Sequence, residues 1–173
     1  MTKAVALLVS LACISSYAQN APAYVQGNAT PNGGASTLAY SSNVTAGDAL
    51  YAMLYYNPTG PTLAFSDSQD NSWITSKTGV LATNQDMVVV GCAVAGSNGS
   101  DTGTFLANGA ATSVEGVIYE VRNATCAQDV TAVLSDMNAQ ASCNSGSLTT
   151  SIANDLLIGM CGFVQTGRWR HYS

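Results

Sequence analysis

Three oxygen-bearing side chains lie close together in the polar stretch 65–73, which reads F-S-D-S-Q-D-N-S-W. Asp67, Asp70 and Asn71 could bind Ca²⁺, because hard cations prefer carboxylate and carbonyl oxygens. Their spacing differs from that of an EF-hand loop, and no glutamate follows where that loop places its bidentate ligand. The structural alternative is that an Asp side chain caps a turn while Trp73 packs into the core.

Aromatic side chains offer a second kind of site. Trp73, Tyr55 and Tyr119 could stack on a sugar ring if they face solvent, and aromatic residues also dominate protein interfaces. The alternative is that they belong to the core, because the strands that carry the two tyrosines are apolar on both faces. The ligand that such aromatics predict is a polysaccharide, and the protein partner is a neighbouring surface domain.

Paired carboxylates could act as acid and base in a glycosidase, and the candidate pairs are Glu115 with Glu120 and Asp67 with Glu120. Glu115 and Glu120 are five positions apart, so on one strand they point to opposite faces. The only histidine, His171, lies near the chain end, and no G-x-S-x-G nucleophile motif occurs. We therefore expect no catalytic residues and no enzymatic activity.

The first 18 residues predict a secretory signal peptide. Lys3 supplies the positive start, residues 4–14 form an apolar run too short to span a bilayer, and small residues precede a cleavage site after Ala18. Removal of this leader also removes Cys13 and leaves four cysteines in an exported chain, which predicts two disulfides. We expect Cys126 to pair with Cys143, because they flank one polar loop, and Cys92 to pair with Cys161.

Charge and composition exclude some partners. The chain has 5 Lys and Arg residues against 10 Asp and Glu residues, and only 9% of its 173 residues are charged. Nucleic-acid binding requires a basic surface, and so does docking on anionic lipid. We therefore expect neither partner, no membrane span after leader cleavage, and a secreted or cell-surface location.

The elements that must position these residues are strands. Strand-like runs recur at 21–28, 36–41, 49–56, 62–65, 72–76, 86–95, 102–107, 112–121, 147–152 and 155–164, separated by Gly, Asn and Pro turns. This spacing is typical of an all-β antiparallel sandwich of about ten strands. The run 49–56 is apolar on both alternating faces, which predicts a central strand covered on both sides. Asn108-Gly109 predicts a hairpin that joins 102–107 to 112–121.

The composition changes abruptly after Gly167, where two basic residues and the histidine gather. We expect 19–167 to form the sandwich domain and 168–173 an atypical tail. The chain also stops soon after a core-type strand, which suggests a truncated or frame-shifted end.

Four motifs in order resemble bacterial exported β-sandwich modules: residues 44–56, 65–73, 117–121 (V-I-Y-E-V) and 154–159 (N-D-L-L-I-G). These modules look like immunoglobulin-like or jelly-roll domains of secreted and surface proteins, in which the polar turn commonly reads D-S-x-G-N-x-[WY]. This chain has Asp70 in place of that glycine. The resemblance implies fold and compartment. The leading expectation is a non-enzymatic module for adhesion, ligand contact or assembly; a carbohydrate-binding module, with or without Ca²⁺, is the alternative, followed by a glycosidase fragment.

Overall fold

The structure is a computed structural model that describes residues 20–31, 34–56, 62–80, 87–127, 149–151, 156, 163–165 and 168–170. All regular elements within these ranges are β-strands. The same residues contain no helix with the length and apolar character needed to cross a bilayer. The predicted leader, Cys143, Cys161 and His171 lie outside this description. Of the expected strand at 147–152, only residues 149–151 are described, and they are not in a strand.

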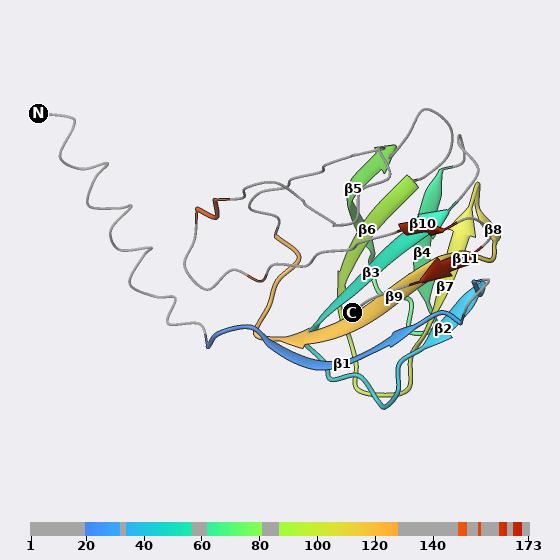
Figure 1. Cartoon of the computed structure of the whole chain (residues 1–173). Helices are drawn as coiled ribbons and strands as arrows, with labels where there is room; N and C mark the ends of the chain where they lie inside the picture. Colours follow the sequence, from blue (N-terminus) through green and yellow to red (C-terminus); the bar gives the residue numbers. More distant parts are fainter. Residues whose placement is uncertain are drawn as a thin grey trace, which may run out of the picture.

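Two antiparallel sheets pack face to face, as in a β-sandwich (Figure 1). The larger sheet has the order β1-β9-β3-β6-β5 and the smaller has the order β2-β7-β4, with β8 also paired to β7. The strand bounds are β1 Ala23–Ala29, β2 Thr37–Ala39, β3 Ala49–Tyr56, β4 Leu63–Asp67, β5 Ile74–Val80, β6 Met87–Val94, β7 Thr102–Ala107, β8 Ala110–Ala111, β9 Glu115–Arg122, β10 Phe163–Gln165 and β11 Arg168–Arg170. The prediction of an all-β antiparallel fold is confirmed.

Strand β3 is central, as its sequence predicts. It pairs with β6 on one side and β9 on the other. Leu50, Ala52 and Leu54 enter the core between the sheets, while Ala49 and Met53 on the opposite face are also buried. Apolar residues at both parities therefore follow from burial on both faces of the sheet.

The smaller sheet contributes its largest side chains to the same core. Phe105 of β7 is fully buried and its ring lies 5.2 Å from that of Phe65 on β4. The two residues are also direct register partners. Large cross-strand aromatic pairs of this kind stabilise a sheet and fix its register against the facing layer.

The predicted hairpin at Asn108-Gly109 forms only in part. Both residues have positive φ angles, as a type I′ turn requires, but the returning strand is only β8, two residues long. The chain then crosses to the larger sheet, where β9 pairs with β1 and β3 instead of β7. The prediction that 112–121 returns along β7 is wrong. The apolar residues of β9 find burial in the larger sheet, and a turn motif specifies only its nearest pairs.

Strand β10 pairs with β11 in a separate two-stranded sheet, with Val164 opposite Trp169. Residues 168–170, expected to belong to an atypical tail, therefore take part in a hairpin with the end of the expected strand 155–164.

Candidate functional site

The turn between β4 and β5 is organised by the carboxylate of Asp67. Its Oδ1 accepts hydrogen bonds from the backbone N–H groups of Gln69 (3.1 Å) and Asn71 (3.0 Å). Its Oδ2 accepts from Asn71 Nδ2 (3.0 Å) and from Trp73 Nε1 (2.6 Å). Four donors occupy both oxygens of a buried carboxylate, so a cation could use Asp67 only by displacing some of them.

The other two predicted metal ligands also serve the turn. Asn71 Oδ1 accepts a hydrogen bond of 2.8 Å from the N–H of Gly96, which ties the turn to the segment after β6. Asp70 is exposed and has a φ of 56°, a left-handed conformation that Asp tolerates better than most residues. Within the described part of the chain, no group of three His, Cys, Asp or Glu residues could hold a metal ion.

Trp73 occupies the core side of this turn. Its ring lies edge-on to Phe65 with centroids 4.3 Å apart, and it packs against the shared core. The ring also lies over Gly91 of β6, where a Cβ would come within 3.3 Å of it. Trp73 therefore closes one end of the core between the sheets, as the structural alternative expected, although the turn joins the two sheets rather than two strands of one hairpin.

Tyr119 lies on the outer face of the larger sheet, directly opposite Tyr51 of β3. It is half-buried and makes an edge-on contact with Tyr24 of β1, with ring centroids 6.2 Å apart. Burial raises the pKa of the Tyr119 hydroxyl above its usual value. The side chain of Tyr55 lies outside the described residues. The structure therefore brings Tyr119 together with Tyr24 and Tyr51, and it places Trp73 on the opposite face of the sheet.

The aromatic residue that sequence reasoning missed is Tyr24, which is 65% exposed. Ile74 and Val94, 59% and 49% exposed, share its outer face, because their register partners Cys92 and Ala49 point that way. The alternation of residues along β1 could have predicted that Tyr24 faces away from the core. In an edge strand with few apolar residues, however, this alternation is a weak signal.

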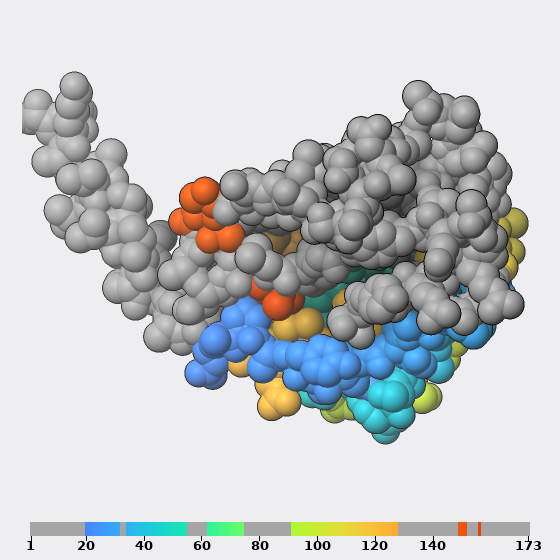
Figure 2. All heavy atoms as spheres, viewed as in Figure 1, coloured from blue at the N-terminus to red at the C-terminus, as the bar shows by residue number. Residues whose placement is uncertain are grey.

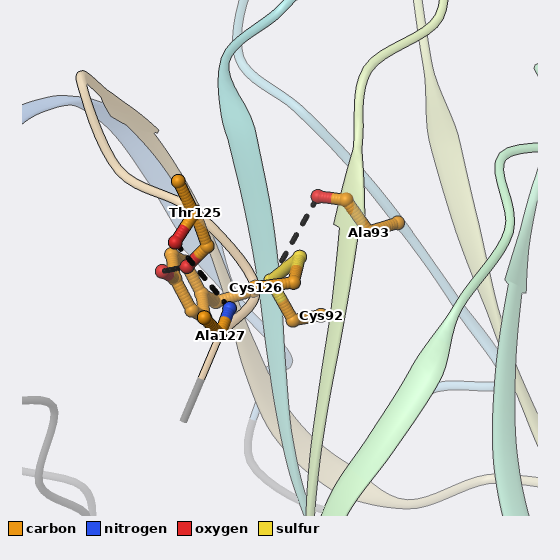
Figure 3. Close-up of a disulfide and its surroundings, with 6 residues drawn as sticks. Cys92, Ala93, Thr125, Cys126 and Ala127 are labelled. Carbon is orange, nitrogen blue, oxygen red and sulfur yellow. Dashed lines mark hydrogen bonds between the residues drawn. A yellow bond between two sulfur atoms is a disulfide. The ribbon is translucent and has the colours of Figure 1, made fainter. Parts of the chain in front are cut away.

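A disulfide joins Cys92 to Cys126, with 5.5 Å between their Cα atoms (Figure 3). The expected pairings Cys126–Cys143 and Cys92–Cys161 are both wrong. The chain leaves β9 and crosses the outer face of β3, where the Tyr51 hydroxyl donates a 2.9 Å hydrogen bond to the carbonyl of Thr125. This crossing segment, residues 123–127, brings Cys126 to β6. The length of a loop in the sequence could not predict this path.

The proposed acid–base pairs are not arranged at a surface. Glu120 is fully buried on the inner face of β9, whereas Glu115 has the opposite parity and points to the outer face. Asp67 also faces inward and is 8% exposed. Neither Asp67 nor Glu120 could reach a polysaccharide without opening the sandwich.

Two buried polar atoms in the described residues have no hydrogen-bond partner, the Tyr40 hydroxyl and Asp101 Oδ2. Asp101 Oδ1 accepts hydrogen bonds from both the N–H and the hydroxyl of Ser68. Burial and the neighbouring Asp67 carboxylate raise the pKa of Asp101 above its usual value. Burial and the nearby acids likewise raise the pKa of Tyr40. Both positions favour the neutral form of the side chain, which indicates a structural role for Tyr40 and Asp101.

Comparison with known proteins gives no relative from which a function could be carried over: no protein-family model matches the chain, and no curated protein or solved structure is significantly similar to it.

Proposed function

We propose that this chain is a non-enzymatic, exported β-sandwich module that makes protein contacts in adhesion or assembly through the outer face of its larger sheet. The observation that carries the proposal is the exposure of Tyr24, Ile74 and Val94 on that one face. Exposed apolar and aromatic groups that share a face are typical of interaction surfaces.

The use of the carboxylates supports the non-enzymatic part of the proposal. Asp67 and Glu120, the acids best placed by sequence for chemistry, are buried and hold loops to strands through hydrogen bonds. The Cys92–Cys126 disulfide supports an exported protein, because such bonds persist mainly in oxidising compartments.

The order of the strands favours a jelly-roll over an immunoglobulin-like topology. The chain changes sheet between β1 and β2, between β2 and β3, and again between β3 and β4. Strand β9 then returns to lie between β1 and β3, and β7 lies between β2 and β4. This wrapping of paired strands around one core is the arrangement that a double Greek key produces.

The test is self-association of the full chain, measured by sedimentation velocity at increasing concentration. The variant Tyr24→Ser/Ile74→Ser/Val94→Ser should lose any self-association of the wild type. The matched control, Ala110→Ser/Ala111→Ser, changes exposed apolar residues on the smaller sheet and should behave as wild type. A wild type that stays monomeric, or a triple variant that associates equally well, contradicts assembly with its own copies.

A carbohydrate-binding module is the second candidate, favoured by the exposed ring of Tyr24 beside Tyr119. A glycan array probed with the full chain, with and without Ca²⁺, tests it directly. Binding that Tyr24→Ala abolishes would place carbohydrate ahead of assembly. Glycan binding that depends on Ca²⁺ would make the turn at Asp67 a candidate metal site again.

A further inference from the structure

A row of four register partners crosses the outer face of the larger sheet near the end of β9. In order across the sheet they are Tyr24 of β1, Val121 of β9, Ala49 of β3 and Val94 of β6. The ends of this row are exposed, Tyr24 by 65% and Val94 by 49%. Its two middle residues are buried, Val121 at 3% and Ala49 at 0% exposure. The exposed groups that carry the proposed function are therefore separated by a covered centre.

The crossing segment 123–127 passes over this part of the face. It begins where β9 ends, its Thr125 carbonyl accepts the hydrogen bond from Tyr51 of β3, and its Cys126 is bonded to Cys92 of β6 (Figure 3). Tyr51 and Cys92 are register partners in the neighbouring row of the sheet. Figure 2 shows β1, in blue, lying against the orange residues of β9 and the segment that follows it. A segment on this path covers the centre of the row and leaves both of its ends open.

The disulfide is the main attachment of the crossing segment to the sheet. Among the described residues, one hydrogen bond joins the segment to β3, from the Tyr51 hydroxyl, and one of 3.3 Å joins Asn123 Nδ2 to the carbonyl of Ala21. No backbone hydrogen bond within the same part of the chain links 123–127 to a strand. Each side chain of the segment is exposed or half-buried, so none anchors it in a core. Without the disulfide, little would keep the segment on the sheet.

We propose that the Cys92–Cys126 disulfide is a redox-controlled clamp, whose reduction frees the crossing segment and turns the row into one continuous apolar strip for a second copy of the chain. The inference rests on the proposed function, because it concerns the regulation of the same face. A continuous strip strengthens an interface more than separated groups do, since residues at the centre of a contact lose all their water. The clamp is closed in oxidising surroundings, where disulfides persist.

The clamp opens by thiol–disulfide exchange with a dithiol reductant. Cys126 is half-buried and Cys92 is 1% exposed, so a thiolate of the reductant attacks Sγ of Cys126. The bond between the two cysteines breaks, and Cys92 leaves as a thiolate that takes a proton from water. The second thiolate of the reductant then displaces Cys126, which also takes a proton, and the dithiol is oxidised to its own disulfide. The carbonyl oxygen of Ala93, 3.9 Å from Cys92 Sγ, can accept the new thiol hydrogen.

Alkylation of the reduced full chain with iodoacetamide tests the release of the segment, with the modification of each cysteine followed by peptide mass spectrometry. If reduction frees the segment, Cys92 loses its cover and should react within about tenfold of the rate of Cys126. If the segment stays in place without the bond, Cys92 stays buried and should react more than about 100-fold more slowly than Cys126. This second result would overturn the proposal.

Global unfolding would also expose Cys92, and low concentrations of urea separate the two routes. Local release exposes little surface, so the rate of Cys92 alkylation should be almost independent of urea. A rate that rises with urea as steeply as the unfolding equilibrium would show that Cys92 reacts only in the unfolded chain, which contradicts the clamp. A reduced chain that has lost its β-sheet circular dichroism also contradicts it, because the strip exists only in the folded sandwich.

Sedimentation velocity of the oxidised and the reduced chain measures the consequence for assembly. Reduction should strengthen self-association several-fold. Val121→Ser should remove this gain, because Val121 lies at the centre of the row. The matched control Ala111→Ser, an exposed position on the smaller sheet, should retain the gain. A reactive Cys92 without any gain in self-association refutes the role of the strip in assembly.

The clamp and the proposed function fail in different measurements. An oxidised wild type that stays monomeric counts against the proposed function, whereas the alkylation of Cys92 is independent of association. A Cys92 that stays protected after reduction refutes the clamp, even where the oxidised chain associates through Tyr24 and Val94.

Discussion

Trp73 donates its indole N–H to Asp67 Oδ2 at 2.6 Å, across the turn that carries the chain from the smaller sheet to the larger. The bond joins two residues six positions apart, one at the end of β4 and one just before β5. The same carboxylate caps the turn backbone at Gln69 and Asn71. Asp67 thus orients the ring that closes this end of the core.

Replacement of Asp67 by Asn should destabilise the fold by about 2–3 kcal/mol, because the new amide group would face a donor where Oδ2 now accepts hydrogen bonds. Denaturant unfolding measures this loss, and the near-ultraviolet signal of Trp73 should weaken. The control Asp70→Asn keeps a left-handed-tolerant residue on an exposed position and should change stability by no more than ~0.5 kcal/mol. Equal effects of the two changes would contradict the central role of Asp67.

Gly103 of β7 should not accept a side chain. A Cβ there would lie 1.9 Å from Cζ of Phe65, whose ring is fixed between Trp73 and Phe105. Gly103→Ala should therefore cost on the order of 2–3 kcal/mol of unfolding free energy, since the rings must shift in a packed core. Gly96→Ala is the matched control, because its Cβ would meet only Asn71 Oδ1 at 3.4 Å. A tolerated Gly103→Ala would show that Phe65 packs elsewhere.

The disulfide should be found between Cys92 and Cys126 by mass spectrometry of non-reduced peptides. Its removal in Cys92→Ser/Cys126→Ser should cost about 3–4 kcal/mol, because the bond closes a loop of 34 residues in the unfolded chain. Tyr51→Phe serves as the comparison, since it removes only the hydrogen bond to Thr125 from the same crossing segment. Peptides that link Cys126 to Cys143 would contradict the observed pairing.

Two tyrosine hydroxyls should differ in their contribution to stability. The buried Tyr40 hydroxyl has no hydrogen-bond partner within the described part of the chain, so Tyr40→Phe should be neutral or should stabilise by about 1 kcal/mol. The half-buried Tyr51 hydroxyl has a partner in the Thr125 carbonyl, so Tyr51→Phe should cost about 0.5–1.5 kcal/mol. Thermal unfolding of both variants measures the difference. A costly Tyr40→Phe would show that a bound water satisfies this hydroxyl.

Local sequence pattern predicted strands in both sheets. The bounds of β3 and β7 match their apolar runs, and β3 is central because it is apolar at every position. The left-handed conformation of Asp70 was also foreseeable, since Asp or Asn substitutes for glycine in such turns. The true partners of β9 were not, because the turn at Asn108-Gly109 specifies two residue pairs and then no more.

The buried polar clusters show more clearly what could not be predicted from the sequence. Nothing in their spacing associates Glu120 with Gln26, 94 positions away, or with Thr45, 75 positions away. Their meeting depends on β9 lying between β1 and β3, which is a property of the sheet order. Asp67 and Glu120, which looked like a ligand or an acid–base pair in sequence, lie buried inside the sandwich.

The sequence by itself determined the class of this protein, because alternation, turn residues and two-sided apolar runs are local properties of β-structure. Only the tertiary structure decided which cysteines pair, which face Tyr24 shares with Ile74 and Val94, and where Glu120 is buried. Each of these depends on contacts between residues distant in the chain. Such contacts are selected by burial of the whole core, and no short stretch of sequence carries that information.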